Sequence, residues 1–346
     1  MKKEPLFFHP KNDYTGSTRI LANTIVNEYH NCPIYVVTDK NSNQGFLSEL
    51  SNVRMIETWS PTYKKKEIKY VTFFCWSFYG MFLALFYGFK FRIFYINTTK
   101  PYYAAIIGWF LNKKIVYHVH EVFTLNSITT KIYRYFFDNT KSHRIFVSKY
   151  TKEQFKENPK CSWEIKYNKL SESFISAVKI RPIEERERNC ILMISSMSRR
   201  KGVDNFINIA SKLPKYKFVL VLSSTMDKII DYFETKAPDN VSIIPAQSNI
   251  QSYLEKADIL LNLSVPPLCI ETFGMTILEA MPYAIPAIVP NIGGPTELVE
   301  DGYNGFCVDV TNIDAIIEAI NIILDINNYQ LFANNSLQRF RYMNSI

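Results

Sequence analysis

Short apolar runs alternate with longer stretches of helical periodicity along most of this chain of 346 residues. The short runs are rich in β-branched and aromatic residues and end in turn-forming residues, which is typical of buried β-strands. The predicted strands are 32–39, 91–98, 113–121, 143–149, 189–197, 216–223, 241–245, 257–264, 285–290 and 305–310. The predicted helices are 17–30, 65–90, 102–111, 203–212, 226–235, 249–256, 275–281, 295–299 and 312–325.

Regular alternation of strand and helix predicts an α/β protein, with parallel sheets that carry helices on both faces. The alternation stops at 179–189, "KIRPIEERERN", a charged stretch that we interpret as a linker. Because the chain is too long for one ordinary domain, we predict two doubly wound domains, 1–178 and 179–330. A C-terminal helix at 331–346 could return toward the first domain. Domains of this type bind ligands at the carboxyl ends of their strands, here in a cleft between the two.

Residues 70–89, "YVTFFCWSFYGMFLALFYGF", form the longest uncharged stretch, with lysines at 64–66 before it and Lys90 and Arg92 after it. Its length would allow it to span a membrane. Its many aromatic residues also fit a helix that is half buried in a domain and half exposed to a bilayer interface. A span, an interface helix and an ordinary core helix therefore all stay open.

The composition limits the class of protein. With 47% hydrophobic and 21% charged residues, the chain is expected to fold. Its six cysteines include no C-x-x-C pair, which argues against a disulfide framework or zinc cluster and favours a reducing compartment. The apolar run near the start is too short for a signal peptide. The net charge of +8 predicts an anionic partner, which could be nucleic acid, anionic lipid or a phosphorylated substrate.

Two glutamates, Glu271 and Glu279, flank Gly274 in "CIETFGMTILEAM", residues 269–281. They could be a solvated loop residue and a helix-surface residue. We predict instead that Glu271 lies in a loop and Glu279 lies more than one turn inside helix 275–281. The free N–H groups at the start of a helix can bind phosphate, and a nearby carboxylate can accept hydrogen bonds from sugar hydroxyls. "NIGGPTELVEDGYNG" repeats the arrangement, with Gly293 and Gly294 before a helix whose first turn contains Glu297.

The stretch "ETFGMTILEAMPYAIPAIVPNIGGPTELVEDGYNG" resembles the motif of retaining glycosyltransferases of family 4, which have the GT-B fold of two Rossmann-like domains with a cleft between them. That motif combines E-x-F-G, a second glutamate within E-A-M, a G-G pair and a further glutamate. The resemblance is strongest over 190–310 and extends with the strand–helix alternation over nearly the whole chain.

The resemblance implies a role for each matching residue. Glu271 would contact the donor sugar and Glu279 the ribose of the nucleotide, while Lys201 would neutralise the diphosphate. The other implied donor-binding residues are Phe273, Gly274, Met275, Gly294 and Glu297. The chain departs from the family at two positions. Ser196 stands where the family usually has an arginine, for which Arg200 (or Arg199) could substitute unless it is only a solvated loop charge. Ala284 replaces a usual glycine, with an expected effect only on local packing.

In the first domain, "YHVHEV" ends a predicted strand with His118 and His120 on one face. His118 could be a buried, hydrogen-bonded residue, whereas His120 and Glu121 match the family's His–acid pair on the acceptor side. "NDYTGSTRI" resembles in part the family's glycine loop, which would place Gly16, Ser17 and Arg19 near the acceptor or a phosphate. No set of side chains has the spacing of a metal site, so neither a metal nor another cofactor is expected.

Two other functions fit poorly. A nicotinamide oxidoreductase would need G-x-G-x-x-G after the first strand, and no nucleic-acid-binding module is visible. The resemblance implies a retaining, metal-independent hexosyl- or related transferase. It would move a sugar from a nucleoside diphosphate sugar to a glycan or lipid-linked acceptor in surface polysaccharide or glycolipid synthesis. A non-catalytic sugar-nucleotide-binding protein of the same fold stays the alternative. Because of the aromatic segment 70–89, we expect a cytoplasmic protein that binds peripherally to an anionic membrane.

Overall fold

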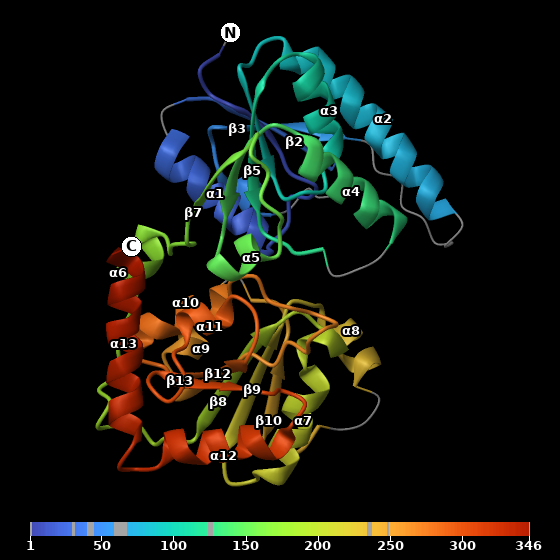
Figure 1. Ribbon diagram of the computed structural model, residues 1–346. Helices are drawn as coiled ribbons and strands as arrows, with labels where there is room; N and C mark the ends of the chain where they lie inside the picture. The colour runs from blue at the N-terminus through green and yellow to red at the C-terminus, as the bar shows by residue number, and fades with distance from the viewer. Residues whose placement is uncertain are drawn as a thin grey trace. The chain divides into compact units, whose positions relative to one another are not determined.

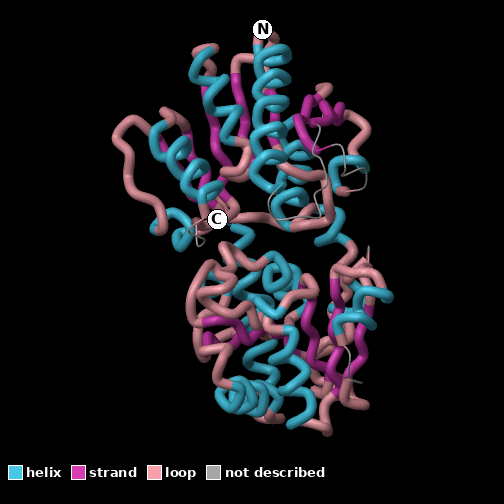
Figure 2. Tube along the Cα trace, turned by 90° about the vertical axis from the view of Figure 1, so that its right-hand side faces the viewer, coloured by secondary structure: helices cyan, strands magenta, loops and turns pink. Residues whose placement is uncertain are grey.

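The computed structural model describes residues 2–29, 32–39, 45–58, 68–123, 127–233, 237–247 and 249–345. The chain divides into two compact units, Met1–Asn168 and Lys169–Ile346. In each unit the strands form a central layer between helices (Figure 2). The division falls before the predicted boundary at 178/179, and the final helix belongs to the second unit. The lysines at 64–66 lie outside the described residues.

The first unit is built on a parallel sheet of seven strands in the order β3-β2-β1-β4-β5-β6-β7. Its strands are β1 (Leu6–Phe8), β2 (Ile34–Asp39), β3 (Val53–Thr58), β4 (Ile93–Asn97), β5 (Lys114–Val119), β6 (His143–Phe146) and β7 (Ser162–Ile165). Its helices are α1 (Gly16–Tyr29), the 3₁₀ helix η1 (Phe46–Glu49), α2 (Ile68–Gly88), α3 (Tyr102–Phe110), α4 (Ile128–Asn139) and α5 (Lys149–Glu153).

Alternating side chains of the strands build two cores in the first unit, one on each face of the sheet. On one face, Leu6 and Phe8 of β1 pack in a cluster with residues of α2, α3 and α4. On the other face, Phe7 packs with residues of α1 and η1. Figure 1 accordingly shows α1 and α2 on opposite sides of the strands. The β1 run is apolar at every position because both faces are covered.

The second unit repeats this design with six parallel strands in the order β10-β9-β8-β11-β12-β13. They are β8 (Cys190–Ser195), β9 (Lys217–Leu222), β10 (Val241–Ile244), β11 (Ile259–Leu261), β12 (Ala287–Pro290) and β13 (Gly305–Val308). The helices are α6 (Glu172–Ser176), η2 (Arg199–Lys201), α7 (Val203–Lys212), α8 (Met226–Tyr232), α9 (Gln251–Leu254), α10 (Met275–Ala280), η3 (Met281–Tyr283), α11 (Pro295–Leu298), α12 (Ile313–Leu324) and α13 (Tyr329–Ser345).

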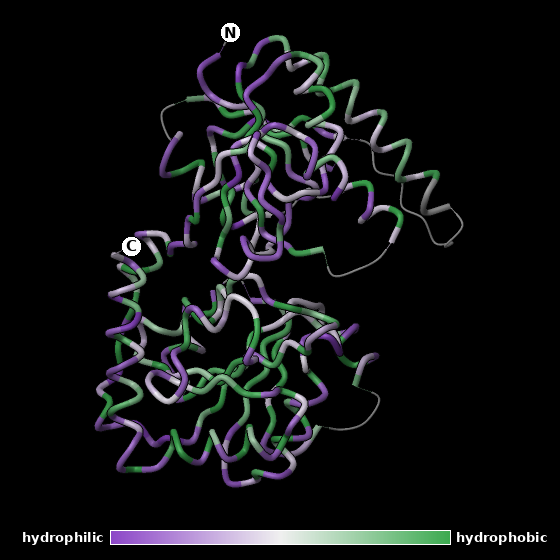
Figure 3. The backbone as a smooth tube through the Cα atoms, in the orientation of Figure 1, coloured by the Kyte–Doolittle hydropathy of each residue, from purple (hydrophilic) through white to green (hydrophobic). Residues whose placement is uncertain are grey.

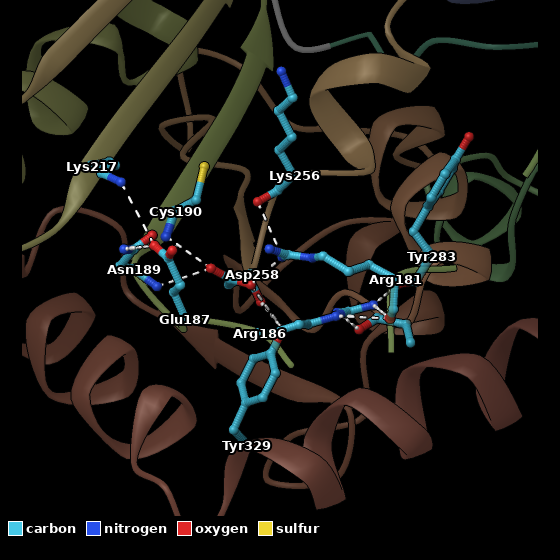
Figure 4. A network of polar contacts seen from close by, with 11 residues as sticks. Arg181, Arg186, Glu187, Asn189, Cys190, Lys217, Lys256, Asp258, Tyr283 and Tyr329 are labelled. Atoms are coloured by element: carbon cyan, nitrogen blue, oxygen red, sulfur yellow. Dashed lines mark hydrogen bonds and ion pairs between the residues drawn. The ribbon is translucent and has the colours of Figure 1, made fainter. Parts of the chain in front are cut away.

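The charged stretch 179–189, predicted as a linker, is part of the second unit and is held by a polar network (Figure 4). Arg186 is 4% exposed, and its guanidinium donates to the carbonyl oxygens of Tyr283 (2.7 Å) and Ala284 (2.9 Å) and to the hydroxyl of Tyr329 (2.9 Å). Arg181 binds the buried carboxylate of Asp258 at 2.6 Å. Arg181 and Arg186 are therefore paired within the second unit, while Lys179, Glu184, Glu185 and Glu187 of the same stretch are exposed.

Candidate active site

The loops that carry Lys201 and Glu271 follow two neighbouring strands, β8 and β11. These strands are central in their sheet, and the order of strands reverses between them. Crossover connections leave the sheet in opposite directions at such a point, so a crevice forms at the carboxyl ends, where α/β proteins bind ligands. The topology alone therefore brings the two predicted residues together.

Lys201 and Glu271 form an ion pair, in which the Lys201 ammonium contacts Oε1 of Glu271. The hydroxyl of Ser264 donates to the same oxygen at 3.0 Å. Their loops are joined by a backbone hydrogen bond of 2.9 Å from Val265 N–H to the Arg200 carbonyl. Burial by itself lowers the pKa of Lys201, but the Glu271 carboxylate and Cys269 outweigh burial and raise it above its usual value. The lysine is thus a permanent cation at ordinary pH.

The two glutamates occupy the positions predicted for them. Glu271 lies in the loop before α10, and Glu279 lies inside α10 with 2% of its surface exposed. Gly274 precedes the helix in a left-handed conformation, with φ of 106°. Phe273 beside it is buried, while Met275 is half-buried. A buried carboxylate must be paired within the protein or by a bound ligand, because burial of an unpaired charge is unfavourable.

The second glycine-containing loop holds the first one in place. Gly294 N–H donates to the Glu271 carbonyl at 2.9 Å. A Cβ atom on Gly294 would lie 2.1 Å from the Thr272 carbonyl oxygen, so only glycine allows this approach. Glu297 follows in the short helix α11 and is half-buried. The G-G pair therefore positions the backbone that carries Glu271.

The structure shows where the two departures from the family motif lie. Arg200 and Ser196 are both exposed on the loop after β8, and neighbouring Arg199 pairs with Asp204 at 3.4 Å. Ala284 is buried and has φ of 56° and ψ of 45°, the left-handed region that favours glycine. Alanine in place of the usual glycine therefore strains the backbone here, in addition to the packing change that the sequence predicted.

In the first unit, the same topological position holds a cluster of buried polar side chains. The strand order reverses between β1 and β4. His9 follows β1, Asn97 ends β4 and His120 follows β5, and hydrogen bonds connect the three. Asn97 is fully buried and His9 is 2% exposed. His9 and Asn97 belong to no motif, and the only signal for them is a polar residue directly after a buried strand.

The hydrogen bonds of Asn97 determine which nitrogen of His120 carries the proton. Its Nδ2 lies 3.1 Å from the Ser17 carbonyl, which can only accept, so this atom is the amide nitrogen. Its Oδ1 therefore accepts from Nε2 of His120, at 2.9 Å. His120 thus carries its proton on Nε2, which makes Nδ1 the basic nitrogen.

The network continues from Asn97 to the start of α1. Nδ2 of Asn97 donates to Nδ1 of His9 at 2.9 Å, so the proton of His9 is on Nε2, which donates to Thr18 at 2.9 Å. Thr18 donates in turn to the Asp13 carboxylate at 2.8 Å. Asp13 thus anchors a directional chain that ends at His120.

Burial keeps these histidines neutral. It lowers the pKa of His9 to about 4 and that of His118, which bonds to the Tyr95 hydroxyl at 3.0 Å, to about 3. The pKa of His120 is well below its usual value because of burial and the neighbouring His118 and His9. The His118 and His120 rings are 4.2 Å apart between centroids.

The remaining predicted residues of the first unit lie around this cluster. One oxygen of Glu121 accepts from both the backbone N–H and the hydroxyl of Thr99, each at 2.7 Å. Gly16 begins α1, and the carbonyl of Ser17 is the acceptor for Asn97. Arg19 stacks over the Phe46 ring, 4.8 Å from its centroid. Its guanidinium is thus held against η1.

Among the residues that the structure describes, no group of three or more His, Cys, Asp or Glu side chains is arranged to hold a metal ion. The cation that the described site offers to an anionic ligand is Lys201.

Residues 178–339 match the model of the family Glycosyl transferases group 1. A glycosyltransferase of Methanocaldococcus jannaschii is 31% identical over 204 residues, which are 57% of this chain and 54% of that protein. A 41.2 kDa protein in the cps region of Klebsiella pneumoniae is 26% identical over 141 residues, 40% of this chain and 37% of that protein. The chain thus spans about half, or less, of these relatives' length.

Among solved structures, HepE of Anabaena in complex with UDP-glucose is similar over 98% of this chain and 96% of its own, with a TM-score of 0.77 and 18% identity. At this identity the similarity concerns the fold. It confirms the predicted GT-B fold with two Rossmann-like sheets.

Proposed function

Because residues 178–339 match the model of the family Glycosyl transferases group 1, also called family 4, we propose that the chain transfers a sugar from a nucleoside diphosphate sugar to a hydroxyl group. The proposed reaction is retaining and needs no metal. Its acceptor is a glycan or a lipid-linked sugar in surface polysaccharide or glycolipid synthesis. The similarity to the protein in the Klebsiella cps region supports this setting.

The observation that carries the proposal is the pairing of Lys201 with Glu271 at the switch point of the second sheet, beside the loop that leads into α10. Lys201 supplies a permanent positive charge for a diphosphate. Both contacts of the Glu271 carboxylate fall on Oε1, so Oε2 is the oxygen that a sugar hydroxyl would use. Glu279 is the proposed partner of the ribose.

In the proposed mechanism the protein positions the substrates and stabilises the leaving group. Lys201 and the backbone N–H groups of Gly274 and Met275 bind the diphosphate, which gains negative charge as the sugar bond breaks. The acceptor hydroxyl attacks from the face that the diphosphate leaves, and a diphosphate oxygen takes its proton. His120, whose proton the Asn97 chain holds on Nε2, is the proposed contact of the first unit for a sugar hydroxyl.

The donor is tested first by thermal shift with a panel of nucleoside diphosphate sugars. UDP-glucose comes first in this panel because HepE has been solved with it. The donor that raises Tm is then incubated with glycan and lipid-linked acceptors, and mass spectrometry detects the product. We expect one donor class to stabilise the wild type, to stabilise Lys201→Met less, and to support transfer with retained anomeric configuration by NMR.

Two results would contradict the proposal in different ways. If no nucleotide sugar shifts Tm, the assignment of the second unit to donor binding is wrong. If a donor binds but no acceptor yields product or donor hydrolysis, the protein is a sugar-nucleotide-binding protein without transferase activity.

A further inference from the structure

An aromatic ridge runs along the outer face of α2 and continues at the end of α3. We define it as Phe74, Phe78, Phe82, Phe86, Phe89 and Trp109. Steps of four residues place Phe74, Phe78, Phe82 and Phe86 on one side of the helix, and Phe89 follows directly after its end. Their side chains are strongly exposed, with 69% for Phe78, 61% for Phe82 and 76% for Trp109. Figure 3 shows hydrophobic colouring along much of α2.

The outer face of α2 lacks the polar side chains expected for a helix exposed to water. Its inner face packs into the core and mixes polar and apolar residues, of which Ser77 is 2% exposed, Thr72 8%, Leu83 8% and Ala84 0%. Its outer face carries large aromatic rings, and no charged residue occurs in 71–89. A helix at a water-exposed surface places its polar residues outward, and an apolar patch of this size indicates an interaction site.

The inner face of α2 is packed against the sheet layer along the helix. A Cβ atom on Gly80 would lie 2.6 Å from the Tyr103 ring of α3, so this glycine permits close helix contact. The Trp76 indole donates to the Thr58 hydroxyl at the end of β3, at 3.2 Å. By length and composition the window Val71–Gly88 could cross a membrane, but 33% of it is buried inside the protein. A helix bound to its own domain by one face offers only the other face to lipid, which favours lying in the interface over spanning it.

Exposed cations gather at one end of the ridge. Lys90 and Arg92 come just after Phe89 in the chain. The backbone N–H of Lys114, at the start of β5, donates to the Arg92 carbonyl at 3.1 Å, which brings Lys114 to the same edge. Lys2 is joined to Lys90 by a backbone hydrogen bond of 2.7 Å, which brings exposed Lys3 to the same edge. Glu4, the next residue in the chain, is acidic. Cations beside an apolar face match a surface that is anionic and has an apolar interior, which describes an anionic bilayer.

We propose that the aromatic ridge and its adjacent cations dock the protein on the surface of an anionic lipid bilayer, with α2 lying in the interface. The rings enter the boundary between headgroups and acyl chains while Lys90, Arg92 and Lys114 contact anionic headgroups. This proposal does not depend on the transferase function, because docking needs neither donor nor acceptor.

The test is flotation of the full chain with vesicles of phosphatidylcholine alone and of phosphatidylcholine mixed with phosphatidylglycerol, at low and high salt. We expect the wild type to float with the anionic vesicles and to bind less at high salt. The variant Phe78→Ser/Phe82→Ser should bind about tenfold or more weakly through lost apolar insertion. The variant Lys90→Glu/Arg92→Glu should lose a similar amount through reversed charge.

Matched controls lie on the second unit. Leu331→Ser and Lys228→Glu replace an exposed apolar residue and an exposed cation on α13 and α8, and both should bind vesicles as the wild type does. Unchanged Tm separates lost docking from lost folding in each variant. As a second readout, Trp109 fluorescence should shift to shorter wavelength with anionic vesicles, and Trp109→Phe should remove that shift.

Three outcomes would overturn the proposal. The wild type could fail to float with either kind of vesicle. The wild type could fail to bind vesicles and instead form a dimer, as measured by light scattering. If Phe78→Ser/Phe82→Ser abolishes that dimer, a second copy of the chain covers the ridge. The wild type could also bind vesicles irreversibly and be released only by detergent, which would indicate a span.

Discussion

At the scale of single residues, Glu279 is the most specific candidate for nucleotide binding. Its carboxylate is 2% exposed inside α10. We predict that Glu279→Ala weakens nucleotide binding by about 1–3 kcal/mol, through loss of a charged hydrogen-bond acceptor for the ribose. Isothermal titration calorimetry measures the change, with Glu279→Gln to keep the side-chain volume and exposed Glu318→Gln as the control. Unchanged affinity in both Glu279 variants would refute the ribose assignment.

Glu271 should behave differently, because its proposed partner is the sugar. We predict that Glu271→Ala lowers kcat far more than it lowers affinity for the bare nucleoside diphosphate. Lys201→Met should weaken that affinity directly, because Lys201 is the cation expected to contact the diphosphate. The measurement combines steady-state kinetics with calorimetry of the nucleotide alone. Equal loss of nucleotide affinity in both variants would show that the two residues act only as one structural pair.

At the scale of elements, the histidine network ties the ends of β1, β4 and β5 to α1, and this connection should depend on pH. The pKa of His9 is 6.5 when unfolded and about 4 in the native state because of burial. As the pH falls, His9 therefore binds a proton at a higher pH in the unfolded chain than in the native protein. The stability that neutral His9 contributes is complete above pH 6.5 and is lost progressively toward pH 4, by up to about 3 kcal/mol.

The corresponding prediction concerns His9→Gln, whose side chain does not titrate in this range. When the pH is lowered from 7 to 5, the Tm of His9→Gln should fall less than the Tm of the wild type. His143→Gln on β6 serves as the comparison, because His143 is only half-buried and bonds to Ser162 and Glu164, so its loss should not reduce the acid sensitivity. Identical losses of Tm in wild type and His9→Gln would mean that burial of His9 does not contribute to acid sensitivity.

The last helix, α13, is anchored through Tyr329 to the polar network of Figure 4. The Tyr329 hydroxyl accepts from Arg186 at 2.9 Å and donates to the Asp258 carbonyl at 3.3 Å, and burial raises its pKa to about 12. We predict that Tyr329→Phe destabilises the second unit by about 1–2 kcal/mol, because buried partners lose a hydrogen bond. Urea unfolding measures this, with exposed Tyr342→Phe on the same helix as the control. A Tyr329→Phe curve that overlays the wild type would show that packing alone holds α13.

At the scale of the whole molecule, the prediction concerns metal ions. We expect transferase activity to survive EDTA, because Lys201 and backbone N–H groups are proposed to stabilise the diphosphate that a divalent cation would otherwise neutralise. Activity is assayed by product formation before and after chelation and dialysis. Loss of activity with EDTA and its recovery with Mn²⁺ would require a metal site that includes residues outside those proposed.

The fold class and most elements could be predicted from the sequence, because alternation of apolar strands and amphipathic helices is a local property of the chain. It also placed Glu271 in a loop and Glu279 within a helix. Short or partly polar elements such as β3, β7 and α4 were not predicted, because their side chains are only partly covered and the apolar signal is weak. The buried position of Arg186 within 179–189 was not predicted either, since charge usually indicates exposure.

Which residues come into contact could be seen only in the folded chain. The Lys201–Glu271 pair and the chain from Asp13 to His120 join residues far apart in the sequence, and strand order alone brings them together. Ser264, His9 and Asn97 have no motif, so their contacts could not be inferred from residue type or spacing. The sequence also left open which face of α2 points outward. An aromatic helix has the same sequence pattern whether its rings face a core or a surface. Packing of Gly80 on Tyr103 turns those rings outward.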